Sequence, residues 1–67
     1  MNKTVTDNIE AERARNHMSI SSLCAALEID RGTYKNWRKK GDVPCSAIIK
    51  CMEIFKVSAD YLLRDVT

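Results

Sequence analysis

One stretch, from Ser19 to Lys40 (SISSLCAALEIDRGTYKNWRKK), constrains the fold more than any other part of the chain. It contains two segments with helical patterning, residues 20–27 and about 31–39. Each follows a side chain that suits the position before a helix, because Ser19 and Asp30 can accept a hydrogen bond from a backbone N–H of the next turn. The stretch therefore predicts two short helices joined by a turn of three residues.

Apolar side chains mark one face of each predicted helix. Leu23 and Leu27 are four positions apart, and Tyr34 and Trp37 are three apart. Residues at these spacings lie on the same side of a helix. With Ile29 in the turn between them, the two apolar faces can close on each other as a helix-turn-helix.

The outward side of the second helix is basic. Five of the ten residues from 31 to 40 are basic and none is acidic, although the whole chain carries a net charge of only +2. The side chains predicted to face solvent are Arg31, Lys35, Asn36 and Lys39, and Arg38 and Lys40 extend the charge. Lysine and arginine neutralise phosphates, and arginine and asparagine can also read base edges. A charged run alone is usually a solvated surface, but its place on the second helix favours DNA contact.

Three further helices are predicted outside this stretch, so the expected fold class is all-α with five short helices. Their predicted spans are 6 or 7 to 16, 45 or 46 to 55 or 56, and 59 to 64. Ser58 is the expected N-cap of the last helix. We predict residues 1–5 as a disordered N-terminus, 6–64 as a single domain with the motif at about 19–40, and 65–67 as a tail.

The apolar positions of these outer helices indicate how they contribute to the core. Ile9 is the one strong anchor of the first helix, helped by Val5, Ala11 and Ala14. Steps of three and four residues define a core face on the fourth helix. That face consists of Ala47, Ile48, Cys51, Met52 and Phe55.

The sequence offers no candidate catalytic or metal site. Cys24, Cys45 and Cys51 are an odd number without paired ligand spacing, and His17 is the only histidine. We interpret the cysteines as small apolar residues and expect no metal or other cofactor. Because His17 has no plausible serine or cysteine partner and no glycine-rich phosphate loop occurs, an enzyme is the poorest hypothesis.

Membrane association is not expected either. No apolar stretch approaches the roughly 18 residues that suggest a membrane span. The first ten residues, MNKTVTDNIE, have no apolar core of a signal peptide. We therefore expect a cytoplasmic protein.

From about Ile9 to Leu63 the chain resembles the DNA-binding domain of the phage repressor and Cro family of helix-turn-helix regulators, in the variety common in phages of low-GC Gram-positive bacteria. Four segments carry the resemblance, in order and at the family's spacing: Met18-Ser19-Ile20 with Leu23-Cys24, Leu27-Glu28-Ile29, Asn36 to Gly41 with Val43-Pro44, and Val57 to Leu63. The resemblance implies a lambda-repressor-like fold whose second motif helix enters the major groove.

The resemblance also implies roles for individual side chains. The candidates for base reading are Arg31, Lys35 and Asn36. The candidates for phosphate contacts are Ser19, Ser21, Arg38, Lys39 and Lys40. The partner would be double-stranded operator DNA, and a homodimer is possible because members of the family usually bind as dimers to half-sites one helical turn apart.

Four positions depart from the family pattern. The small alanine of the first motif helix is Cys24 here, a tolerable change of size. The turn glycine is Glu28 here, and Gly32 near the start of the recognition helix offers no side chain to a base. The family often pairs an arginine of the first helix, here Arg13, with an acid late in the recognition helix. That position is Arg38, so this ion pair is expected to be missing, and Arg38 is expected to contact Glu12 or a phosphate.

Two hypotheses of function follow. The first is a sequence-specific DNA-binding transcriptional regulator of phage or prophage origin, in the cytoplasm of the bacterial host. It would be either a small Cro-like regulator or the N-terminal piece of a longer repressor. The alternative is a modulator or antirepressor that binds a phage repressor protein, with or without DNA. The dimer surface would discriminate between them, but its candidate residues can equally serve the core: Met52, Phe55, Tyr61, Leu62 and Val66.

Overall fold

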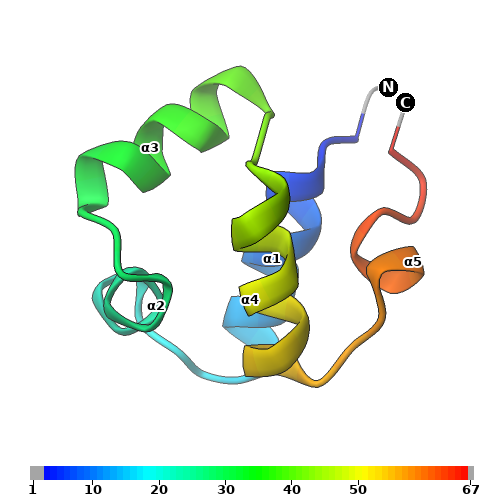
Figure 1. Cartoon of the computed structure of the whole chain (residues 1–67), viewed down its shortest axis with the longest axis horizontal. Helices are drawn as coiled ribbons and strands as arrows, with labels where there is room; N and C mark the ends of the chain where they lie inside the picture. Colours follow the sequence, from blue (N-terminus) through cyan, green and yellow to red (C-terminus); the bar gives the residue numbers. More distant parts are fainter. Residues whose placement is uncertain (1–2, 67) are drawn as a thin grey trace.

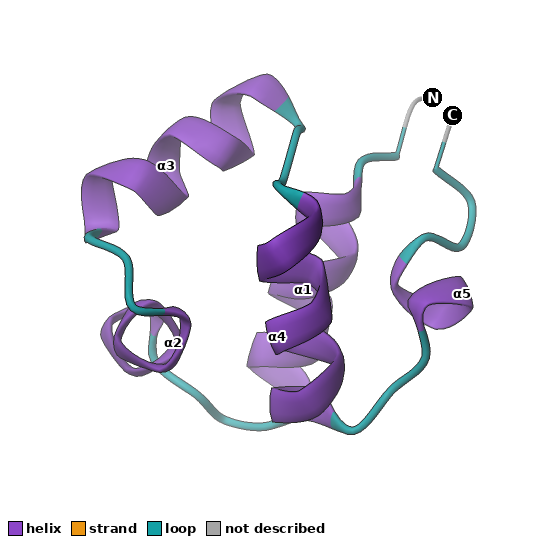
Figure 2. Ribbon diagram, in the orientation of Figure 1, coloured by secondary structure: helices purple, strands orange, loops and turns teal. Residues whose placement is uncertain are grey.

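Five α-helices follow one another in a computed structural model that describes residues 3–66 (Figure 1). They are α1 (Val5–Arg15), α2 (Ile20–Leu27), α3 (Arg31–Lys40), α4 (Cys45–Phe55) and α5 (Ala59–Leu62). Loops and turns join them, and no β-strand occurs between residues 3 and 66 (Figure 2). The structure confirms the prediction of an all-α fold with five short helices.

Side-chain caps fix the starts of three helices at their predicted positions. Ser19, Asp30 and Ser58 each accept a hydrogen bond of 3.0–3.1 Å from the backbone N–H of the residue three positions later. Each cap satisfies a donor that the helix itself leaves without a partner. The fourth helix, α4, begins at Cys45, one of its two predicted starts.

The start of α1 lies earlier than predicted, at Val5 rather than at residue 6 or 7. The Thr4 hydroxyl accepts a hydrogen bond from the Asp7 N–H at 3.3 Å, and the Asp7 carboxylate accepts one from the Thr4 N–H at 3.0 Å. This reciprocal pair is a capping box, which satisfies two backbone donors at once. Residues 3–5 are therefore part of the ordered fold, contrary to our prediction for the N-terminus; residues 1 and 2 lie outside the described residues.

The two ends of the described chain lie side by side (Figure 1). Lys3 and Val66 form an isolated parallel bridge. The last helix, α5, ends at Leu62, two residues earlier than predicted. Val66, which we assigned to a tail, thus contacts the start of the chain; Thr67 lies outside the described residues.

The apolar core draws side chains from every helix and from the loop before α4. Its buried members are Val5, Ile9, Leu23, Cys24, Leu27, Tyr34, Val43, Ala47, Cys51, Phe55 and Leu62. The predicted apolar faces of α2, α3 and α4 contribute to it, with Ile29, Trp37, Ile48 and Met52 half-buried at its edge. Cys24 and Cys51 occupy the core as small apolar residues, whereas Cys45 is exposed.

The buried face of α1 is more polar than predicted. Ile9 and Val5 are buried, but Ala11 and Ala14 are exposed, so the support that we assigned to these alanines is wrong. The remaining buried residues of α1 are Thr6, Asn8 and Glu12. Apolar periodicity does not reveal such residues, because a buried polar group depends on finding hydrogen-bond partners elsewhere in the fold.

Two helices end at residues other than glycine that nevertheless adopt the left-handed conformation typical of glycine. Glu28 after α2 has φ 59° and Lys56 after α4 has φ 55°.

We expect Lys56→Gly to raise the free energy of unfolding by about 0.5–1 kcal/mol, because it relieves backbone strain at some entropic cost. Glu28→Gly should stabilise less, because it also removes an ion pair with Lys50. Urea unfolding followed by circular dichroism measures both; an equal gain would show that the ion pair contributes nothing.

The described part of the chain contains no helix with the length and apolar character that crossing a membrane requires.

Candidate nucleic-acid interface

The candidate interface is formed by α3 and the N-terminal end of α2. In Figure 1, α2 is seen end-on while α3 lies across the view, so the two helices cross steeply. The chain turns between them at the left-handed residue Glu28, whose N–H donates to the Ala25 carbonyl at 3.1 Å. Lys50 of α4 lies 2.9 Å from the Glu28 carboxylate and 3.4 Å from the Leu27 carbonyl. These contacts hold the turn against α4.

The two sides of α3 have opposite character. Its inner side contributes the buried Tyr34 and the half-buried Trp37, whose rings meet edge to face at 6.4 Å. The predicted solvent-facing residues are all exposed: Arg31, Lys35, Asn36, Arg38, Lys39 and Lys40. The predicted exposure is therefore confirmed, and the candidate base-reading and phosphate-contacting side chains of α3 share one open surface.

The two candidate serines lie at the start of α2. Both Ser19 and Ser21 are exposed. The Ser19 hydroxyl already accepts a hydrogen bond from the Ser22 N–H at 3.0 Å and donates one to the Ser22 hydroxyl at 2.9 Å. Ser21 is therefore the better placed of the two to offer its hydroxyl to a phosphate.

The far end of α3 also lies close to α1. Gly41 ends the helix with φ 72°, and a Cβ at this position would come within 2.7 Å of the Thr4 side chain. Glycine is required here both by the left-handed backbone and by the close approach. This contact fixes the C-terminal end of α3, which carries Lys39 and Lys40, against the start of α1.

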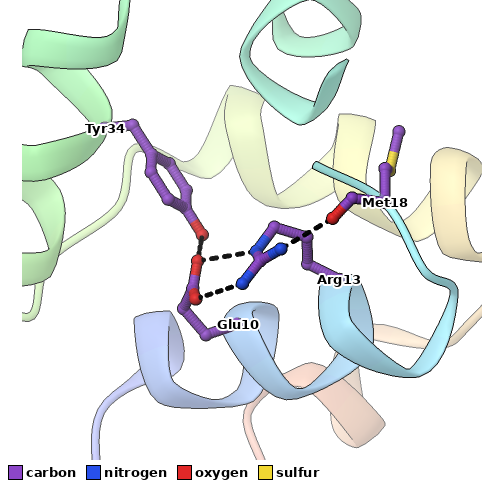
Figure 3. Close-up of polar contacts among 4 residues, drawn as sticks. All are labelled: Glu10, Arg13, Met18 and Tyr34. Atoms are coloured by element: carbon purple, nitrogen blue, oxygen red, sulfur yellow. Dashed lines mark hydrogen bonds and ion pairs between the residues drawn. The ribbon is translucent and has the colours of Figure 1, made fainter. Parts of the chain in front are cut away.

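A polar network joins α1 to the middle of α3 (Figure 3). The Glu10 carboxylate accepts hydrogen bonds from the Tyr34 hydroxyl and from Arg13, whose Nε and Nη2 lie 3.1 and 2.9 Å away. Arg13 also donates to the Met18 carbonyl at 2.6 Å, in the loop before α2. The network thus connects α1, α3 and the approach to α2, and it positions the candidate interface on the rest of the domain.

This network replaces the contact that the resemblance implied. Arg13 pairs within its own helix, and Tyr34 makes the connection to α3. Of the two contacts expected for Arg38, the one with Glu12 is wrong, because the Glu12 carboxylate pairs with Arg15 at 2.8 Å. The contact with a phosphate stays a prediction. No ion pair holds Arg38 among residues 3–66. Its charge, however, lies near enough to the Glu10 carboxylate to stabilise it.

The surroundings of Glu10 keep its carboxylate charged. Burial acts to raise the pKa of Glu10, but hydrogen bonds from Arg13 and Tyr34 and the charges of Arg13 and Arg38 outweigh it, so the pKa lies below its ordinary value of 4.5. Burial, followed by the hydrogen bond to Glu10, raises the pKa of the Tyr34 hydroxyl. Tyr34 therefore stays a neutral donor and Glu10 an ionised acceptor at neutral pH.

This arrangement predicts that part of the free energy of unfolding is lost in acid. The pKa of Glu10 is lower in the folded state than in the unfolded state. Glu10 therefore adds its full contribution to the free energy of unfolding at pH values above the unfolded pKa of about 4.5, and this contribution is lost as the pH falls through the folded pKa. We expect Glu10→Gln to flatten the dependence of the unfolding free energy on pH in this acid range. Glu53→Gln, at an exposed position of α4 outside the network, serves as the control. If both variants lose the same part of the acid dependence, the network is not its source.

Glu10 is the site residue that the sequence analysis missed. The spacing of Glu10 and Arg13 suits an ion pair between neighbouring helical turns, but nothing in the sequence shows that Tyr34 approaches them. No group of three or more histidine, cysteine, aspartate or glutamate side chains within the described chain could hold a metal ion.

Comparison of the chain with family models, with curated proteins and with solved structures finds no match to any of them.

Proposed function

We propose that this protein is a sequence-specific DNA-binding transcriptional regulator of the phage repressor or Cro type, acting in the cytoplasm of a bacterial host. The observation that carries the proposal is the solvent side of α3, where five basic side chains and no acidic one are exposed on a helix held by α1 and α2. An α-helix fits the major groove of B-DNA, and lysine and arginine along it neutralise phosphates.

The proposal assigns base contacts and phosphate contacts to different side chains of α3 and of the start of α2. Arg31, Lys35 and Asn36 contact base edges, with Arg31 suited to guanine and Asn36 to adenine. Phosphates are contacted by Ser19, Ser21, Arg38, Lys39 and Lys40. Phosphate contacts fix the register of the protein on the duplex, and base contacts give the sequence preference.

A homodimer would place two copies of α3 one helical turn apart on an operator. Phe55 and Leu62, two of our candidate dimer residues, are buried in the core and do not offer a surface for it. Val66 is exposed, as are Ile49 and Leu63. The proposed self-contact therefore involves the exposed apolar residues near α5 and on α4 rather than the buried pair.

The experiment that tests the proposal is selection of binding sequences from a pool of random duplexes, followed by fluorescence anisotropy with the recovered sequence. We expect enrichment of one defined sequence, whose affinity exceeds that of an unrelated duplex and falls steeply with added salt. Binding of all duplexes with equal affinity, or of none, would contradict the proposal.

Within this assay, Arg31→Ala is expected to weaken binding to the selected sequence about tenfold. A bidentate arginine–guanine pair contributes roughly 1–3 kcal/mol of discrimination, and about 1.4 kcal/mol corresponds to a factor of ten. Affinity for an unrelated duplex should hardly change. Lys56→Ala removes the same charge from an exposed position after α4 and should leave both affinities unaltered. If Arg31→Ala weakens every duplex equally, Arg31 contacts phosphate and does not read a base.

Two observations favour the second candidate, a modulator that binds a repressor protein. The net charge of the chain is only +2, and Gly32 leaves α3 without a side chain near its start. Under this proposal, the basic side of α3 contacts an acidic surface of the repressor. Size-exclusion chromatography with light scattering distinguishes the two, because only the modulator forms a defined complex with the repressor when no DNA is present.

A further inference from the structure

The last helix, α5, is held in place by parts of the chain that are remote in sequence. It has only four residues, too few for a helix that is stable on its own, and it packs against α1 and α4. The Asn8 side chain of α1 donates hydrogen bonds to the Leu62 carbonyl at 2.7 Å and to the Arg64 carbonyl at 3.0 Å. Leu62 itself is fully buried. In Figure 1, α5 and α3 lie on opposite sides of α4, so this packing surface is separate from the basic side of α3.

The connection between α4 and α5 is short and strained. It consists of Lys56 and Val57, followed by the N-cap Ser58. Lys56 has φ 55° and ψ 50°, a left-handed conformation that is unfavourable for a lysine. Neither glycine nor proline occurs from residue 45 onward, so no helix-breaking residue separates the two helices. If Lys56 adopted ordinary helical angles, α4 would run on into α5 as one straight helix and the strain would disappear.

Straightening the connection would carry α5 away from the surface on which it packs. Leu62 would leave the core, and the carbonyls of Leu62 and Arg64 would lose the Asn8 amide. Loss of a buried apolar side chain and of buried hydrogen bonds is costly, so the straight form needs another surface that makes the same contacts. The identical surface of α1 and α4 on a second copy of the chain supplies them.

We propose that two copies of the chain exchange residues 57–66, so that α5 of each copy packs against α1 and α4 of the other. The exchange preserves the contacts of α5 and removes the strain at Lys56 in both copies. Exchange of an identical element is a low-cost route to a dimer, and a short strained hinge favours it. The proposal does not depend on DNA binding, and it differs from the self-contact between exposed apolar residues because it uses contacts that are buried.

The strength of this association follows from the hinge. A short connection presents α5 to its own surface at an effective concentration of about 1 mM, so exchange without strain relief would need a similar protein concentration. Relief of strain at two hinges should lower that concentration at least tenfold, which corresponds to only about 1.4 kcal/mol for both hinges together. We therefore expect protein refolded from urea at about 1 mM to be mainly dimeric, and protein at about 1 μM to be monomeric.

Size-exclusion chromatography with light scattering measures the dimer fraction after refolding. The exchange itself is tested on dimers refolded from a mixture of isotope-labelled and unlabelled chains. A filtered NMR experiment should then detect the Asn8 side-chain amide of one copy close to Leu62 of the other, because these groups are hydrogen-bonded in the structure. A dimer in which this contact occurs only within one copy would overturn the exchange.

The hinge provides the matched variants. Glycine adopts the left-handed conformation without strain and weakens a continuous helix, so Lys56→Gly favours the bent connection. We expect its dimer dissociation constant to rise at least tenfold. Glu28→Gly makes the same change at the left-handed residue after α2, outside the hinge, and should leave the dimer unaltered. Circular dichroism checks that both variants fold.

The outcomes are distinct from those of the DNA-binding experiments. A wild-type chain that stays monomeric after refolding at about 1 mM would show that the exchange does not occur. Equal dimer formation by Lys56→Gly and the wild type would also overturn the proposal, because the hinge would then play no part. Selection of binding sequences uses α3 and reports on the proposed function alone, so either proposal can fail without the other.

Discussion

Replacement of Asn8 by alanine is expected to lower the free energy of unfolding by about 3 kcal/mol. Asn8 is fully buried in α1, and its Nδ2 donates hydrogen bonds to the Leu62 carbonyl at 2.7 Å and to the Arg64 carbonyl at 3.0 Å. Leaving a buried acceptor without a donor costs about 1–3 kcal/mol, and loss of a buried side chain adds a cavity. Because the two carbonyls lie in α5 and just after it, the variant should also detach this end of the chain from α1.

Urea unfolding followed by circular dichroism measures the loss, and amide hydrogen exchange at Leu62 and Leu63 reports whether α5 opens first. Asn16→Ala, at the C-cap of the same helix, is the matched control. Its Nδ2 donates to the Glu12 carbonyl at 2.8 Å, but the Asn16 backbone N–H donates to the same carbonyl and remains. We expect this control to lose less than about 1 kcal/mol. An equal loss in both variants would contradict the role that we assign to Asn8.

The Asn8 contacts illustrate what the sequence alone does not contain. The Leu62 carbonyl lies 54 positions from Asn8 along the chain, and an asparagine in a charged helix has the same local pattern whether it is buried or solvated. Glu12 is also buried, although the partner of its carboxylate, Arg15, lies only three positions away. Only the packing of α1 against α5 decides which polar residues turn inward.

The local features, in contrast, could be predicted well. Ser19, Asp30 and Ser58 act through backbone donors only three residues away, so their caps depend on sequence within a single turn. The capping box of Thr4 and Asp7 is equally local, with the threonine and the acid three positions apart. The start of α1 was therefore also predictable from the sequence, since a threonine followed three positions later by an acid is the pattern of a capping box.

The candidate site divides in the same way. Periodicity predicted which side chains of α3 are exposed, because exposure follows directly from the position of Tyr34 and Trp37 on the opposite side. The contact between Glu10 and Tyr34 depends on how α1 packs on α3, and the resemblance pointed to a different pair.

The double variant Lys39→Gln/Lys40→Gln is expected to weaken DNA binding about thirtyfold at 0.15 M salt. If each lysine neutralises one phosphate, the slope of log K against log salt should become shallower by about 0.9 per contact, hence by about 1.8 in all. If both proteins bind equally at 1 M salt, this change in slope corresponds to about a thirtyfold loss of affinity at 0.15 M salt. Both residues are exposed at the end of α3, where Gly41 lies against Thr4, so neither substitution removes a core contact. Anisotropy titrations at several salt concentrations measure the slope directly.

Lys56→Gln/Arg64→Gln removes the same net charge just after α4 and just after α5, outside α3 and its contact with Thr4, and is the matched control. A general electrostatic attraction would weaken both double variants alike, whereas phosphate contacts at α3 would change the slope only for Lys39→Gln/Lys40→Gln. The slope also separates the two candidate functions, because release of counterions condensed on DNA requires the nucleic acid itself. If the Lys39→Gln/Lys40→Gln protein keeps its DNA affinity but no longer binds a phage repressor protein, the basic side of α3 is a protein-docking surface and the DNA-binding proposal is wrong.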